Sequence, residues 1–112
     1  MNARNSRIDD QVGATPAEVA ADEVEFAYAL ARMAKALAHP TRVEIVRFLL
    51  EQGECVCGDI VQRLPLVQST VSQHLKQLRE AGLVSGRRER CRTVYRANPA
   101  AFIQLRLLVG AL

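Results

Sequence analysis

The chain lacks several features that point to common classes of protein. Its 112 residues contain no apolar run near the roughly 20 residues that cross a bilayer. Residues 1–16 are polar throughout and hold no apolar signal core. We therefore expect a cytoplasmic protein with no membrane partner. The sequence also has no Ser-His-Asp order, no glycine-rich phosphate loop and no Cys-His-Cys zinc pattern, so we expect no enzymatic activity, no catalytic residue and no catalytic cofactor.

Cysteine is scarce, and its number is odd. Three cysteines in a chain without a signal peptide argue against a disulfide framework. Cys55 and Cys57 form a C-x-C pair, and Cys91 stands alone. This pattern favours thiol or metal chemistry. The alternative is that each cysteine is simply a small buried apolar residue.

Charge is unevenly distributed along the chain. The net charge of +3 combines a balance of −4 in residues 1–25 with a balance of +4 in residues 87–96, where five arginines accompany one glutamate. A concentrated basic segment in a weakly basic protein indicates local contact with nucleic acid. The alternative is that arginines at a hairpin tip keep an edge strand soluble.

The first part of the chain predicts a tail followed by a long helix. We expect residues 1–14 to be a disordered tail and residues 15–112 to form one domain. Thr15-Pro16-Ala17-Glu18 has the composition of a helix start, and the helix should run to about Ala38. Its apolar stripe consists of Val19, Phe26, Leu30, Met33 and Leu37.

Two shorter helices should follow. His39-Pro40 breaks the first helix, because a residue before proline disfavours helical geometry, and His39 is expected to act as a local cap. A second helix is predicted from Thr41 to Glu51, ending at Gly53. Its core positions are Val43, Ile45, Val46, Leu49 and Leu50. After a very short strand at Cys55-Val56, a third helix should extend from Cys57 to Leu64.

The most informative stretch is LVQSTVSQHLKQLREAG, residues 66–82. A helix from about Gln68 to Ala81, closed by Gly82, places three apolar residues on one stripe: Val71, Leu75 and Leu78. Its outer faces carry short polar side chains rich in hydrogen-bond donors, which suit phosphates and base edges in a major groove. The predicted DNA-contacting residues on this helix are Gln68, Ser69, Thr70, Ser72, Gln73, His74 and Lys76.

The last part of the chain predicts a hairpin and a final helix. Residues 83–88 and 91–97 alternate in polarity and should form two strands, with Arg87–Arg90 at the tip. Arg88 and Arg90 are further candidates for DNA contact. The helix that starts at Asn98-Pro99 is apolar on more than one face, which suggests a subunit interface.

This order of elements predicts a mainly α fold with a small β-wing, the winged helix-turn-helix. The N- and C-terminal helices are then left to form a dimer interface, unless the first helix packs only within its own domain. A two-fold dimer would present two recognition helices about one helical turn apart, ~34–36 Å. The expected partner of the homodimer is therefore double-stranded operator DNA with an inverted repeat.

Three runs of sequence resemble a known family. They are ALAHPTRVEIVRFLLEQGECVCGDI, LPLVQSTVSQHLKQLREAGLVSGRRE and TVYRANP, and they resemble the arsenic-sensing branch of the ArsR/SmtB metalloregulatory repressors over roughly residues 30–100. The resemblance implies a homodimeric repressor that releases operator DNA when a metal or metalloid binds. It implies DNA contacts by Ser69, Thr70, Ser72, Gln73, His74, Arg88 and Arg90. It also places Cys55 and Cys57 on the motif that marks the inducer site.

The cysteine pair suits a thiophilic inducer. As(III) and Sb(III) are soft centres that prefer thiolates and take three ligands, so Cys55 and Cys57 offer most of a site. Cys57 starts a helix, where a thiolate is stabilised, and strain in that helix would tilt the recognition helix. Cys91 is the only candidate third ligand. If Cys55-Val56 pairs with the wing near Val94–Arg96, Cys91 lies roughly 10–16 Å from the pair along that strand at ~3.3 Å per residue, and it could join only if the wing bends or the other subunit supplies it. A water molecule or small thiol could complete the site instead.

The chain departs from its relatives at several ligand positions. Ile60 stands where some arsenic sensors have a third cysteine, and Val94 and Arg96 stand where others carry cysteines in the wing. No cysteine precedes the first helix, which argues against a cadmium/lead-type site. Residues 100–112 lack His, Asp and Glu, which argues against a zinc-type site between the final helices.

Two other functions are compatible with this fold. One is a thiol-redox or sulfide-responsive repressor, in which Cys55, Cys57 or Cys91 is oxidised. The other is a protein-interaction module that has lost DNA binding.

Overall fold

The computed structural model describes residues 16–112, with side chains from residue 22 onward. The elements, in order, are α2 (Pro16–Leu37), α3 (Pro40–Gln52), β1 (Cys55–Val56), α4 (Cys57–Arg63), α5 (Gln68–Glu80), β2 (Val84–Glu89), β3 (Arg92–Ala97) and α6 (Pro99–Gly110). The predicted tail, the Thr15 cap and the side chain of Val19 lie outside the described residues. Within residues 16–112, no helix combines the length and apolar composition needed to cross a membrane.

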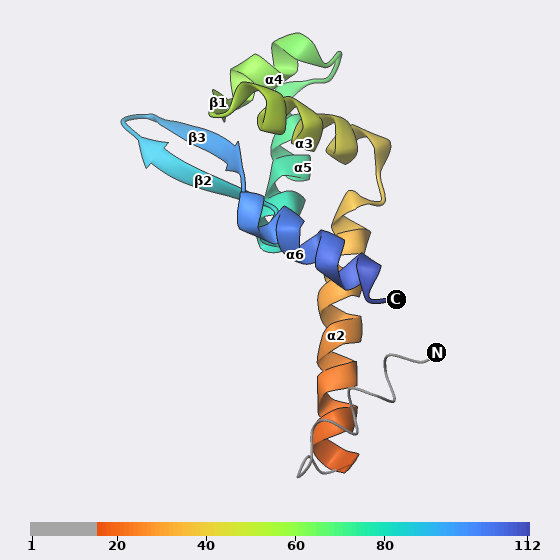
Figure 1. The fold of residues 1–112 in the computed structure, drawn as a ribbon. Coiled ribbons are helices and arrows are strands. Elements are labelled where there is room, and N and C mark those ends of the chain that lie inside the picture. Colours follow the sequence, from red (N-terminus) through yellow and green to blue (C-terminus); the bar gives the residue numbers. More distant parts are fainter. Residues whose placement is uncertain (1–15) are drawn as a thin grey trace.

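The molecule has a helical centre from which α2 and a β-hairpin project (Figure 1). Helices α4 and α5 pack against each other as the helix-turn-helix, and α3 contacts both α5 and β3. The hairpin of β2 and β3 forms the wing. The predicted mainly α winged helix-turn-helix is therefore confirmed.

The break between α2 and α3 follows from His39 and Pro40. His39 has an extended backbone, and its Nδ1 accepts a hydrogen bond from the N–H of Thr41 at 3.1 Å. Pro40 occupies the first turn of α3, where its missing N–H costs no helical hydrogen bond. The prediction that His39 is a local cap is confirmed.

The sheet has the antiparallel strand order β1-β3-β2. Cys55 pairs with Tyr95 and Val56 with Val94. The predicted short strand is therefore confirmed, and it lies against the second strand of the wing. On the other side of β3, the register runs from Val84 opposite Ala97 to Glu89 opposite Arg92.

The predicted extent of the hairpin tip, Arg87–Arg90, is wrong. Arg87 and Arg88 belong to β2 and are paired with β3, so only Arg90 and Cys91 form the turn. Arg90 has φ 59, and the favoured two-residue hairpin turns require a positive φ at the first of their two central positions. The arginine-rich composition of residues 87–90 concealed this shorter turn.

The core lies between α3, α4, α5 and the base of the wing. Its fully buried side chains are Ile45, Leu49, Ile60, Val71, Leu75, Leu78 and Leu83, so the predicted stripe on the recognition helix is confirmed. Two predicted core positions are wrong, because Val43 and Leu50 are 39% and 49% exposed. They are seven residues apart and share a helical face that is turned away from the face of Ile45 and Leu49.

Helices α2 and α6 contact each other and leave apolar side chains exposed. In α2, Met33 is buried, whereas Tyr28 is 71% exposed. In α6, Phe102 is buried, whereas Leu107 is 69% exposed. Figure 1 shows α6 crossing α2, with the N-terminal half of α2 extending beyond the crossing. These two helices together carry an apolar surface that a single chain does not cover.

Candidate nucleic-acid interface and cysteine site

The outer face of α5 presents most of the predicted DNA-contacting side chains to solvent. Gln68, Ser69, Ser72, Gln73 and Lys76 are exposed, and Thr70 is half-buried. The opposite face anchors the helix in the core. After the helix, Gly82 adopts φ 78 and Leu83 donates to the carbonyl of Leu78 at 3.0 Å. This closing motif turns the chain directly from the recognition helix into the wing.

His74 lies differently from its neighbours on α5. Arg42 Nε donates to His74 Nδ1 at 3.1 Å, and the ring centroids of His74 and His39 are 4.5 Å apart. The pKa of His74 is lowered by burial and then by the nearby His39 and Arg42. Arg42 also donates to the carbonyl of Ala36 at 3.3 Å. The neutral His74 ring thus connects the recognition helix to the α2–α3 corner.

Sequence reasoning missed Arg42 as a partner of the recognition helix. It lies in the first turn of α3, 32 residues before His74, and an arginine at such a position is usually a solvated surface residue. Nothing in the helical periodicity indicates that contact. The contact depends on how the start of α3 packs beside α5, so only the tertiary arrangement reveals it.

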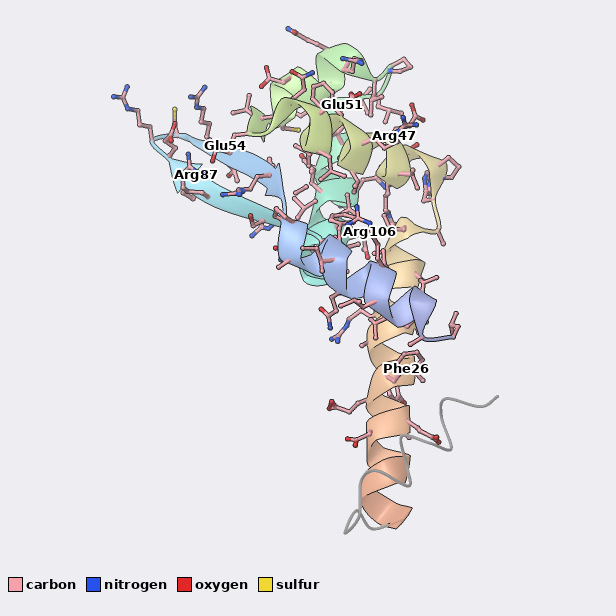
Figure 2. The ribbon with its side chains drawn as sticks, in the orientation of Figure 1. Phe26, Arg47, Glu51, Glu54, Arg87 and Arg106 are labelled. Atoms are coloured by element: carbon pink, nitrogen blue, oxygen red, sulfur yellow. The ribbon has the colours of Figure 1, made fainter. Side chains whose placement is uncertain are left out.

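The wing combines paired and unpaired arginines. Arg87 contacts Glu54 at 2.7 Å and Glu89 at 2.9 Å, and Arg92 contacts Glu89 at 3.3 Å. We call Glu54, Arg87, Glu89 and Arg92 the wing ion network. Figure 2 shows Glu54 and Arg87 side by side at the wing.

Arg88 and Arg90 lie outside this network. Among the described residues, no carboxylate approaches either guanidinium within 4.0 Å. Their positive charge is exposed on the wing and can attract phosphates. Both arginines predicted to contact DNA thus lack a carboxylate partner in the described part of the chain, as does Arg96 in β3.

Cys55 and Cys57 have different surroundings. Cys55 is only 5% exposed in β1, and burial followed by the negative charge of Asp59 raises the pKa of its thiol. Cys57 is half-buried as the first residue of α4. Its Sγ lies 3.7 Å from Ser72 Oγ and 4.0 Å from the carbonyl oxygen of Gln68. One thiol of the pair therefore touches the recognition helix.

The backbone between Cys55 and Cys57 is hydrogen-bonded to a side chain in the first turn of α4. Asp59 Oδ2 accepts a hydrogen bond from the N–H of Val56 at 3.0 Å, and a carboxylate in the first turn favours the helix dipole. Two closely spaced sulfur donors suit a thiophilic centre. Bound to such a centre, they would be two of the three ligands that it takes.

Cys91 lies apart from the pair. It is exposed in the wing turn, four residues along the chain from Tyr95, the strand partner of Cys55. At ~3.3 Å per residue, four residues of extended strand span about 13 Å. Within the described residues, no group of three or more His, Cys, Asp or Glu side chains is arranged to hold a metal ion. The structure therefore does not bring Cys91 to Cys55 and Cys57.

Comparison with known proteins agrees with this architecture. Residues 39–85 match the family profile described as "Bacterial regulatory protein, arsR family". A similar solved structure is the homodimeric winged helix-turn-helix DNA-binding domain of a possible ArsR-family transcriptional regulator from Mycobacterium bovis. It has a TM-score of 0.65 and 31% sequence identity, and the match covers 90% of this chain and 88% of that one. The chain belongs to the ArsR family.

Two relatives of this chain in the ArsR family are named for different functions. A "biofilm growth-associated repressor" of Xylella fastidiosa is 40% identical over 76 residues, which is 68% of this chain and 66% of the relative. An "arsenic resistance transcriptional regulator" of Pseudomonas putida is 41% identical over 66 residues, 58% of this chain and 51% of the relative. The matches thus span between half and two thirds of these relatives' own lengths.

Proposed function

We propose that the protein is a homodimeric transcriptional repressor that binds inverted-repeat operator DNA and releases it when As(III) or Sb(III) binds the thiolates of Cys55 and Cys57. The observation that carries this proposal is the contact between Cys57 Sγ and Ser72 Oγ. In this contact a thiol, the kind of ligand that As(III) prefers, lies against the face of α5 that we predict to contact DNA. The relative from Pseudomonas putida, named for arsenic resistance, supports the choice of inducer.

DNA binding is supported by the surface of α5 and the wing. Exposed amide, hydroxyl and ammonium groups on α5 suit base edges and phosphates. Arg88 and Arg90 add charge on the same continuous segment of chain, since only Ala81, Gly82 and Leu83 separate α5 from β2. We assign base and phosphate contacts to α5 and phosphate contacts to the wing.

The dimer is supported by the exposed apolar residues of α2 and α6. In each chain these are Val24, Tyr28, Ile103, Leu107 and Val109. A second copy of the chain would bury them in a two-fold interface. The similar structure from Mycobacterium bovis is described as homodimeric, and two recognition helices related by a two-fold axis fit an inverted repeat.

Release of DNA follows from the changes that the two cysteines must undergo before they can act as ligands. Each thiol has to lose its proton, and Cys55 also has to leave its buried position in β1. Cys57 has to turn away from Ser72 and Gln68, so the support that α4 gives α5 changes. Allosteric couplings of ~1–3 kcal/mol already alter affinity about 5–150-fold. A small displacement of α5 is therefore sufficient.

The test is binding to the inverted repeat in the protein's own promoter, followed by fluorescence anisotropy at fixed salt under reducing conditions. We expect arsenite to weaken binding by wild-type protein and by Cys91→Ser, which serves as the matched control. Cys55→Ser and Cys57→Ser should bind DNA and fail to respond. An unchanged arsenite response in the Cys55→Ser/Cys57→Ser double variant would exclude these thiols as the inducer site.

A further inference from the structure

The wing ion network begins immediately beside the cysteine pair. Glu54 directly precedes β1, and its carboxylate accepts two hydrogen bonds from Arg87, from Nη1 at 2.7 Å and from Nη2 at 3.3 Å. Arg87 lies in β2, opposite Val94 of β3, and Val94 in turn lies opposite Val56 of β1. The Arg87 side chain therefore reaches across the central strand to the residue that precedes the cysteines.

The network continues from Arg87 to the end of the hairpin. Arg87 Nη2 also donates to Glu89 at 2.9 Å, and Glu89 accepts from Arg92 at 3.3 Å. Glu89 and Arg92 are the last paired residues before the wing turn. Two glutamates and two arginines thus form a neutral row from the cysteine site to the tip that carries Arg90.

We propose that the Glu54–Arg87 ion pair couples the cysteine site to the wing, so that a change at Cys55 and Cys57 repositions the wing against DNA. This inference rests on the proposed function, and it adds the wing to α5 as a second element through which the inducer acts. Glu54 and Arg87 are positioning residues in this arrangement. The arginine that holds the wing is distinct from Arg88 and Arg90, whose charge remains for phosphates.

Each residue of this ion pair is attached to a functional element, which distinguishes the pair from an isolated ion pair on the surface. An exposed ion pair contributes little to stability on its own, and here both side chains are about half exposed. Glu54, however, shares a backbone with Cys55, and Arg87 shares a strand with Arg88. A shift of β1 that separates Glu54 from Arg87 therefore releases the part of the wing that carries the unpaired arginines.

The experiment compares Glu54→Gln and Arg87→Gln with the control Glu51→Gln. Glu51 is exposed on α3 away from the wing, as Figure 2 shows, and no ion pair involves it among the described residues. Its substitution changes net charge as Glu54→Gln does. For each variant, anisotropy gives the operator Kd with and without arsenite, and arsenite binding is titrated separately.

The decisive quantity is the operator Kd with arsenite divided by the operator Kd without it. We expect that ratio to fall at least about threefold in Glu54→Gln and in Arg87→Gln, although they change net charge in opposite directions, and to stay unchanged in Glu51→Gln. Arsenite binding itself should be retained in every variant. The double variant should show no further loss, because the two residues act through one contact. If arsenite weakens binding by wild type, an equal ratio in all variants and in wild type would overturn the proposal.

A second measurement separates failure of this proposal from failure of the proposed inducer. If the wing and the cysteine site are coupled, DNA bound to the wing also holds the cysteine site in its DNA-bound arrangement, so operator DNA should slow alkylation of Cys57 by iodoacetamide. The slowing should be smaller in Glu54→Gln and Arg87→Gln than in wild type and Glu51→Gln. This measurement requires no metalloid, and it therefore decides the role of the ion pair even if arsenite leaves the wild-type complex intact. The same degree of slowing in all four proteins would contradict it.

Discussion

Cys57 Sγ and Ser72 Oγ lie 3.7 Å apart, across the contact between α4 and α5. Ser72 is exposed on the face of α5 that we assign to DNA. The other thiol of the pair, that of Cys55, is 5% exposed and belongs to the core. The two cysteines of the C-x-C motif are therefore unequal. One is accessible beside the recognition helix, and the other becomes available only when β1 moves.

This inequality predicts an order of thiol reactivity. Burial and the Asp59 charge raise the pKa of Cys55, and the thiolate is the reactive form. In native protein, Cys55 should therefore be alkylated by iodoacetamide more slowly than the exposed Cys91, because the raised pKa lowers the thiolate fraction of Cys55 and burial restricts access of the reagent. Mass spectrometry of the peptides after timed quenching measures both rates. In denaturant the two rates should converge, and a Cys55 rate that equals that of Cys91 in native protein would contradict the placement of Cys55.

The partial burial of His74, beside His39 and Arg42, predicts that stability decreases at acidic pH. The folded-state pKa of His74 lies below the ordinary value of 6.5, so the unfolded chain binds the proton more readily than the folded one. The contribution of His74 to the free energy of unfolding is fully present above about pH 6.5, and it decreases as the pH falls towards the pKa of His74 in the folded state. The urea midpoint of wild type should accordingly fall between about pH 7.5 and pH 5.5.

A substitution at His74 tests this assignment. In His74→Gln the midpoint should fall less over the same range, because glutamine does not titrate and its oxygen can still accept from Arg42. The pKa values of Glu54 and Glu89 are lowered from 4.5, each first by its hydrogen bond to Arg87. Their contributions therefore change only below about pH 4.5. An identical pH dependence in His74→Gln and wild type would show that another group titrates.

The pairing pattern of the wing predicts different salt dependence for different arginines. Arg88 is free of carboxylate partners among the described residues, whereas Arg92 is paired with Glu89. Replacing Arg88 with Gln should reduce the slope of log Kd against log salt by about one phosphate contact, with Arg90→Gln acting similarly. Arg92→Gln, which removes the same charge, should change the slope much less. Equal slope changes would mean that charge alone matters and that the pairing pattern does not.

Sequence alone predicted the order of elements and the recognition helix, because local signals are strong there. His39-Pro40 ends α2, and Gly82 closes α5. The stripe of Val71, Leu75 and Leu78 defines which face of α5 is buried. Such boundaries depend on backbone geometry within a few residues, so they can be read from the chain directly.

The contacts between distant residues could not be predicted in this way. Arg42 reaches His74 and Glu54 reaches Arg87 across 32 and 33 residues, and each looked like an ordinary surface charge in the sequence. Leu50 was predicted to be buried because apolar residues in a helix usually are, yet it faces away from the core of a single chain. Which charges pair and which apolar faces stay open depends on how the helices pack.

The open apolar face of α6 gives the last prediction. Leu107 is 69% exposed, and Gln104 on the same helix is also exposed. If a second copy covers α6, Leu107→Glu places a charge in an apolar interface, where burial of an unpaired charge is strongly unfavourable. Sedimentation equilibrium should show dissociation to monomers at concentrations where wild type is dimeric, together with loss of operator binding. Gln104→Glu introduces the same charge as a control and should remain dimeric. A Leu107→Glu variant that stays dimeric would place the interface elsewhere.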